Sequence, residues 1–147
     1  MHLTMFTDYG LRTLILLALR PDGQASIPEV AAAYGISENH LTKVAHALGQ
    51  SGLVETIRGR KGGMRLGRPA AKIGLGEVVR AMEPSLALVT CQEGGACAIG
   101  GCCGLQGVMN EAQAALLAVF DRYTLADVVT PGDARLLARL GLGEPAR

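Results

Sequence analysis

The sequence contains no tryptophan and only two phenylalanines and three tyrosines among its 147 residues. Hydrophobic residues nevertheless make up 49% of the chain. A core must therefore be built mainly from Ala, Leu, Val and Ile, a composition that favours helices. The length suits one domain, or one domain with an appended helix.

A large excess of charge is also absent, because the net charge is only +1. The total therefore does not indicate a nucleic-acid partner. The distribution does, since six basic residues and no acidic residue lie between Arg58 and Lys72. Local asymmetry of this kind is more informative than the total charge.

Long apolar runs are missing as well. The run between Arg12 and Arg20 is far shorter than the roughly 20 residues that a membrane-spanning helix needs. We also find no secretion signal, and we therefore expect a cytoplasmic protein with reduced thiols and no membrane partner.

All four cysteines lie within thirteen consecutive residues. Cys91, Cys97 and Cys103 are six residues apart in the glycine-rich segment TCQEGGACAIGGCCGL, and Cys102 precedes the last of them. Three thiolates on a flexible loop can converge on one metal centre, and glycine lets backbone N–H groups approach cluster sulfides. An iron–sulfur cluster is therefore the preferred interpretation.

Structural zinc, a disulfide and a thiol enzyme are the alternatives for these cysteines. Zinc sites usually show two C-x-x-C pairs or a Cys/His set, and neither spacing occurs here. A disulfide would have to form in a reducing compartment. A redox pair of Cys102 and Cys103 would be vicinal, a geometry that rarely closes a good disulfide, and no activating histidine lies nearby. We therefore expect no enzymatic activity.

Residues 1–74 predict a winged helix-turn-helix domain. A first helix is expected from a Thr7 cap to Arg20, a short helix after Ser26, and another after Ser37. Strands at 53–57 and 64–66, joined by a basic turn, would form the wing. Such a turn can be merely solvated, but its place directly after a helix-turn-helix favours a wing.

The second helix of this motif begins with polar side chains suited to reading DNA. Asn and His can bond to base edges, Lys can reach guanine or phosphate, and wing arginines can contact phosphates or a minor groove. The candidate DNA contacts are Asn39, His40, Thr42, Lys43, Arg58, Arg60 and Lys61, with Arg65 as a further wing residue.

Residues 75–129 are predicted to hold the cluster loop and dimerisation helices, and residues 130–147 a tail. A helix is expected over 75–82, the cysteine loop over 90–104 and a long helix over 105–123. The long helix has one apolar stripe, consisting of Leu105, Val108, Met109, Ala112, Leu116, Val119, Phe120 and Tyr123. The stripe indicates core or, at least equally, a dimer interface. The predicted fold class is therefore mainly α.

Residues 1–129 as a whole resemble the Rrf-type winged-helix iron–sulfur repressors, and among them the nitric-oxide-sensing members. The matching segments are LTMFTDYGLRTL, SENHLTKVAHALGQSGLVETIRGRKGGMRLG, GEVVRAMEP and FDRYTLADVV. The resemblance implies a homodimeric repressor that leaves its double-stranded DNA operator when nitric oxide reacts with the cluster. It also implies that Cys91, Cys97 and Cys103 hold a [4Fe–4S] cluster, with [2Fe–2S] as the alternative.

The resemblance further implies a fourth ligand, an aspartate of the other subunit's first helix, which corresponds to Asp8 of the partner subunit. A carboxylate is a weak ligand for iron compared with a thiolate, so that iron would react most readily. Arg12, one helical turn from Asp8, would pair with it after cluster loss and act as a switch. Judged on the residues alone, Asp8 would be an ordinary first-turn carboxylate that complements the helix dipole.

A sensor of iron–sulfur supply or of peroxide within the same family is the alternative function. The repressor of iron–sulfur assembly has a histidine three residues after the third cysteine, where this chain has Gln106. The extra thiol of Cys102 departs from the pattern, and either it or Cys103 could be the third thiolate ligand.

Overall fold

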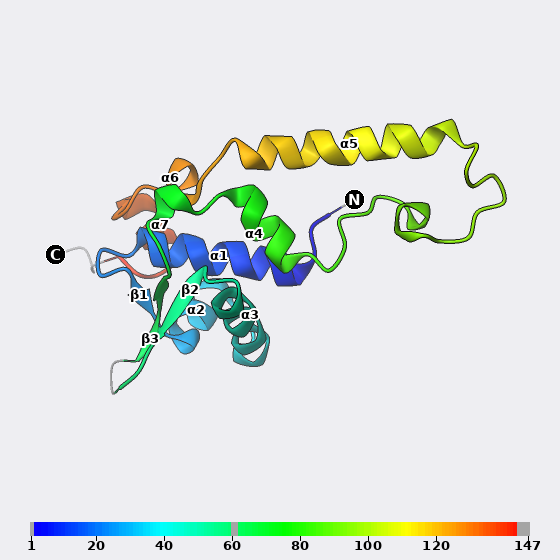
Figure 1. Cartoon of the computed structure of the whole chain (residues 1–147). Helices are drawn as coiled ribbons and strands as arrows, with labels where there is room; N and C mark the ends of the chain where they lie inside the picture. The colour runs from blue at the N-terminus through cyan, green and yellow to red at the C-terminus, as the bar shows by residue number, and fades with distance from the viewer. Residues whose placement is uncertain (1, 60–61, 144–147) are drawn as a thin grey trace.

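A computed structural model describes residues 2–59 and 62–143 of the chain. It is mainly helical with a small antiparallel sheet, as predicted (Figure 1). The elements in chain order are α1 (Met5–Leu19), β1 (Gln24–Ala25), α2 (Ile27–Tyr34), α3 (Glu38–Gln50), β2 (Val54–Ile57), β3 (Gly63–Leu66), the 3₁₀ turn η1 (Ala70–Lys72), α4 (Leu75–Met82), the 3₁₀ turn η2 (Thr90–Glu93), α5 (Gly104–Asp121), α6 (Leu125–Val128) and α7 (Ala134–Arg139).

Helix α1 lies at the centre of the fold, where it contacts α2, α3, α4, α6 and strands β1 and β3. Its C-terminal half is buried on several sides, with Leu14, Leu16, Leu17 and Leu19 at most 1% exposed. The predicted Thr7 cap was wrong. The hydroxyl of Thr4 accepts the backbone N–H of Thr7 at 3.3 Å, so the helix begins one turn earlier and Thr7 is buried within it.

The helix-turn-helix follows from local capping. Ser26 Oγ accepts the backbone N–H of Glu29, while Glu29 Oε2 accepts that of Ser26 at 2.7 Å, which completes a capping box at the start of α2. Gly35 ends α2 in the left-handed conformation, at φ 65°. Ser37 occupies the cap position of α3, although its side chain bonds to no described backbone N–H group.

Strands β1, β3 and β2 form an antiparallel sheet in that spatial order. Val54 pairs with Leu66 and Ile57 with Gly63, so β2 and β3 make the predicted wing. Strand β1 was not predicted, because only two residues pair with β3 and so short a segment shows no alternation. Of the predicted wing residues, Arg60 and Lys61 lie outside the described part of the chain.

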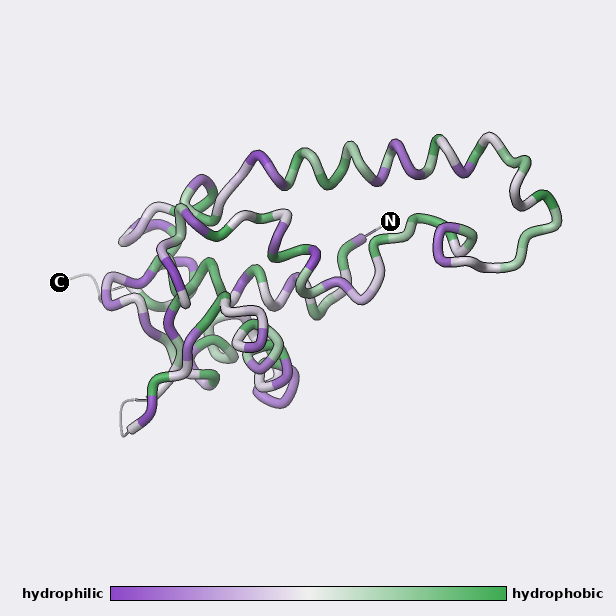
Figure 2. The backbone as a smooth tube through the Cα atoms, in the orientation of Figure 1, coloured by the Kyte–Doolittle hydropathy of each residue, from purple (hydrophilic) through white to green (hydrophobic). Residues whose placement is uncertain are grey.

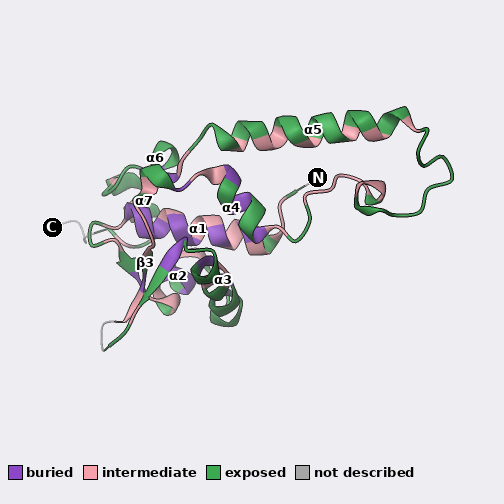
Figure 3. Ribbon diagram, in the orientation of Figure 1, coloured by how far each residue is buried: buried purple, intermediate pink, exposed green. Residues whose placement is uncertain are grey.

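Helix α5 projects from this body as an arm of 18 residues, about 27 Å long at 1.5 Å per residue. None of those residues, all of them described, is buried. Apolar and polar positions alternate along the arm (Figure 2), and its exposure contrasts with the burial of α1 (Figure 3). The apolar stripe is therefore not a core within this chain.

The root of the arm is fastened to α4. Arg80 donates two hydrogen bonds to the carboxylate of Asp121, at 2.6 and 2.7 Å, and this pairing lowers the pKa of Asp121 below its usual value. The backbone N–H of Leu75 also donates to the carbonyl of Tyr123 at 2.9 Å.

Within residues 2–59 and 62–143, no helix is long and apolar enough to cross a membrane.

The close approach of Gly67 to the chain before β2 gives a stability prediction. A Cβ at Gly67 would lie 2.4 Å from the backbone oxygen of Gly52, whereas one at Gly49 would meet nothing within 4 Å. We expect Gly67→Ala to lower the free energy of unfolding by about 1–3 kcal/mol through overpacking. The control Gly49→Ala should raise it by up to about 1 kcal/mol, because alanine favours a helix. Urea denaturation measures both, and equal stability of the two variants would contradict the close contact.

Candidate functional site

The first candidate site is the outer face of α3, where Asn39, His40, Thr42 and Lys43 are all exposed. The opposite face, with Leu41, Val44 and Leu48, is buried. The hydroxyl of Thr42 donates to the carbonyl of Glu38 at 2.8 Å, so its proton is used within the helix. Because all four side chains are exposed, a ligand can reach them. Their contacts with DNA stay a prediction.

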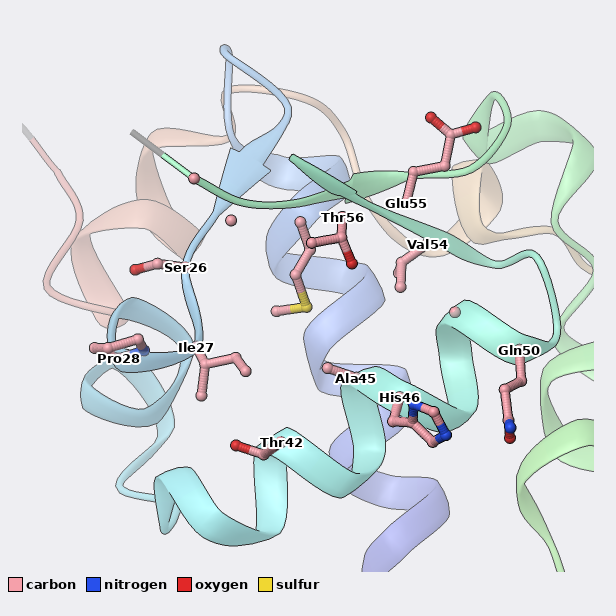
Figure 4. A pocket seen from close by; sticks show the side chains of 14 residues that line it. Ser26, Ile27, Pro28, Thr42, Ala45, His46, Gln50, Val54, Glu55 and Thr56 are labelled. Atoms are coloured by element: carbon pink, nitrogen blue, oxygen red, sulfur yellow. The ribbon is translucent and has the colours of Figure 1, made fainter. Parts of the chain in front are cut away.

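An open groove of about 1020 Å³ lies between α3 and the wing (Figure 4). Its walls come from the start of α2, from α3 and from strands β2 and β3. The α3 side chains lining it are Thr42, Ala45, His46 and Gln50. His46 and Gln50 were missed from the sequence, although they follow Thr42 at i+4 and i+8 and so share its face. Polar groups along this groove can form hydrogen bonds to the backbone or to the base edges of a nucleic acid.

His40 and Lys43 lie on the side of α3 that approaches α1. The ring of His40 stacks on that of Tyr9, with centroids 6.5 Å apart and planes at 27°. Lys43 joins these two rings in lining a small, mostly apolar pocket of about 210 Å³ that also includes Met5 and Phe6. His40 therefore connects α3 to the start of α1.

Asp8 and Arg12 form an ion pair on the first turns of α1. Arg12 Nε lies 3.1 Å from Asp8 Oδ1, and Nη2 lies 2.9 Å from Oδ2. The guanidinium carbon of Arg12 is also 5.8 Å from the ring centroid of Tyr34, at the end of α2. Burial raises the pKa of Tyr34, Arg12 opposes the rise and Asp8 adds to it. Asp8 is thus linked through Arg12 to α2, while its neighbour Tyr9 stacks on His40 of α3.

The second candidate site is the cysteine loop, at the end of α5 farthest from the winged-helix body (Figure 1). All four cysteines are free; Cys91 and Cys103 are half-buried, while Cys97 and Cys102 are exposed. Among the residues that the structure describes, no three His, Cys, Asp or Glu side chains converge as metal ligands. The single chain therefore gathers the thiols in one loop without closing them on a centre, and the ligand set stays a prediction.

The two ends of the loop meet the same helix. Cys103 is the residue that caps α5, and Gln106, in the first turn of α5, donates from Nε2 to the carbonyl of Cys91 at 3.4 Å. Gly94 and Gly101 adopt φ values of 81° and 83°, which let the loop turn back. Soft thiolates on such a backbone suit an iron–sulfur cluster. Gln106 serves here as a donor to the loop backbone.

Comparison with known proteins assigns the fold and the class of function. The Rrf2 family, described as iron-dependent transcriptional regulators, matches residues 3–131. The chain belongs to the Rrf2 family.

Relatives of this Rrf2 chain include two proteins named HTH-type transcriptional regulator NsrR. That of Bacillus subtilis is 52% identical over 132 residues, covering 88% of this chain and 90% of the relative. That of Shouchella clausii is 48% identical over 136 residues, covering 90% and 91%.

Solved structures agree with this assignment. CymR, the global cysteine regulator of B. subtilis, matches with a TM-score of 0.72 and 26% identity, covering 87% of this chain and 95% of CymR. T. potens IscR matches with a TM-score of 0.71 and 26% identity, covering 87% and 85%. The predicted winged-helix class is confirmed by these structures, and the family and the relatives named NsrR assign the chain a regulatory role, not an enzymatic one.

The wing residue Arg58 is expected to contribute to DNA affinity through a phosphate contact. Arg58→Ala should weaken binding to a mixed-sequence duplex and reduce the slope of log affinity against log salt by about 1, because one phosphate contact is lost. Arg139→Ala, on α7 outside the motif, is the matched control and should leave the slope unchanged. Fluorescence anisotropy at several salt concentrations measures the affinity and the slope of both variants. An unchanged slope for Arg58→Ala would show that Arg58 makes no phosphate contact.

Proposed function

We propose that this Rrf2 chain is a homodimeric repressor that senses nitric oxide through a [4Fe–4S] cluster held by Cys91, Cys97, Cys103 and Asp8 of the partner subunit. The observation that carries the proposal is that every thiol of a winged-helix regulator is free and lies in one loop. The description of the family as iron-dependent and the relatives named NsrR support it.

Helix α5 supports the dimer. On α5, Leu105, Val108 and Val119 are between 45% and 59% exposed, and Tyr123, just beyond the end of the helix, is 44% exposed. Exposed apolar side chains along one arm are covered when the same arm of a second copy packs against them, as twofold symmetry allows. Such pairing would also let the loop of one subunit approach α1 of the other, from which the fourth ligand would come.

The ion pair of α1 supports a switch. When bound, the cluster supplies irons that react with nitric oxide. Holding it would require Asp8 to leave Arg12, with which it pairs at 2.9 Å. Arg12 faces Tyr34 in α2, and Tyr9, beside Asp8, stacks on His40 in α3. Exchange of the Asp8 partner would therefore alter contacts to both DNA-binding helices. A 100-fold change in DNA affinity needs about 3 kcal/mol of such coupling.

Anaerobic purification followed by nitric oxide titration tests the whole proposal. We expect a coloured protein containing iron and sulfide, whose operator affinity falls about 100-fold or more as nitric oxide is added. Nitric oxide should also remove the cluster signal faster than oxygen or a chelator, which separates this function from a sensor of iron–sulfur supply or peroxide. A colourless protein whose DNA binding ignores nitric oxide would sink the proposal.

The two adjacent thiols provide a matched pair of variants. Cys103→Ser should abolish the cluster, because the serine hydroxyl is a poor ligand for iron at neutral pH. Cys102→Ser should keep the iron content and the nitric oxide response close to those of the wild-type protein. Iron and sulfide analysis with the visible spectrum distinguishes the two. The reverse result would assign the third thiolate to Cys102.

A further inference from the structure

Gln92, the residue after Cys91, makes all the hydrogen bonds that its side-chain amide can make. Its Oε1 accepts the backbone N–H groups of Leu88 at 2.6 Å and Val89 at 3.1 Å. Its Nε2 donates to Asn110 Oδ1 at 2.9 Å and to Gln113 Oε1 at 2.8 Å. A glutamine amide has two lone pairs and two N–H donors, so this side chain is saturated.

The partners determine which way the amide points. Backbone N–H groups can only donate, so the oxygen of Gln92 must face the loop backbone and its NH₂ group must face α5. Asn110 and Gln113 are three residues apart and share one face of α5. With Gln106, which bonds to the carbonyl of Cys91, they form a row of amides at i, i+4 and i+7. The row fastens η2, and Cys91 with it, to the helix.

The middle of the loop is held differently. Residues 93–102 are exposed throughout. The backbone hydrogen bonds of residues 94–101, within the described chain, stay inside the loop, as from Gly95 to Thr90 at 3.0 Å and from Gly100 to Cys97 at 3.0 Å. Cys97 therefore lies on a stretch of loop that is shaped only by its own turns, while Cys91 and Cys103 lie where the loop meets α5.

We propose that Gln92 is a positioning residue that holds Cys91 against α5 before any cluster is present, so that Cys91 and Cys103 receive the cluster and Cys97 closes on it last. This deepens the proposed function and rests on it for the identity of the group received. The physical reason is preorganisation: a loop end already ordered by four hydrogen bonds loses less conformational entropy when its thiolate binds.

The reactivity of the cluster-free thiols tests the anchoring without any cluster. The reduced protein is treated with iodoacetamide, and alkylation is followed at each cysteine by mass spectrometry. Gln92→Ala should raise the rate at Cys91 about three- to tenfold, because the hydrogen bonds that hold the backbone next to Cys91 against α5 are lost. The rate at Cys97 should stay within about twofold, since no restraint on it is removed. Gln24→Ala, an exposed glutamine on β1, is the matched control and should change neither rate.

A conservative variant separates positioning from general disruption. In Gln92→Glu the carboxylate can accept the same two backbone N–H groups, and the amides of Asn110 and Gln113 can rotate to donate to it. Its alkylation pattern should therefore stay close to that of the wild-type protein. Anaerobic cluster assembly with iron(II) and sulfide, followed by visible absorbance, should be about three- to tenfold slower for Gln92→Ala and near normal for Gln92→Glu.

Each outcome decides a different point. Unchanged Cys91 alkylation and unchanged assembly in Gln92→Ala would overturn the inference, and so would an equal rise at Cys97. If the wild-type protein assembles no cluster while Gln92→Ala still exposes Cys91, the proposed function fails and the anchoring of Cys91 is supported.

Discussion

Helix α1 is apolar around most of its C-terminal half and is stable only when other elements cover it. The fold supplies that cover with α2, α3, α4, α6 and two strands. The first turns of the same helix are less enclosed and carry Asp8, Tyr9 and Arg12. Because the buried half fixes the direction of α1, it also places these side chains beside α2 and α3. The core and the predicted switch thus depend on one packing arrangement.

The arm α5 obeys a different constraint, since none of its residues, all of them described, is buried and its contacts with the body are chiefly to α4. The ion pair of Arg80 with Asp121 is exposed, and such pairs contribute little by themselves. Backbone pairing does more, because Leu75 bonds to Tyr123 and Leu125 to Ile73 on either side of the bridge between Gly74 and Thr124. The root of the arm is therefore set by main-chain hydrogen bonds, which specify position more sharply than flexible charged side chains.

The features that could be predicted from the sequence have local causes. The capping box of Ser26 and Glu29, the turn at Gly35 and the bounds of α4 each depend on residues a few positions apart. The misses have two kinds of cause: the Thr7 cap was misplaced by one turn for the local reason that Thr4 caps α1, whereas others depend on surroundings distant in the sequence. Leu16 and Leu17 are buried as deeply as Leu14 because α1 is enclosed on several sides by elements from other parts of the chain.

The candidate site shows the same division. The cysteine loop was visible in the sequence, and its assignment to a cluster with Asp8 came from the family resemblance. The groove lined by His46 and Gln50 and the hydrogen bonds of Gln92 were not predicted. Those hydrogen bonds join residues 18 and 21 positions apart, and no period in the sequence marks such a contact.

The exposure of the cysteine loop has a consequence for how the protein behaves after it loses its cofactor. No residue from 90 to 104, all of them described, is buried, so the loop adds almost nothing to the hydrophobic core. Small zinc domains unfold without their metal because the metal replaces a core. Here the winged-helix body has a hydrophobic core of its own. Under the proposed function, a chain that has lost its cofactor would stay folded and could be refilled. The signal would then be reset by repair of existing molecules, without synthesis of new ones.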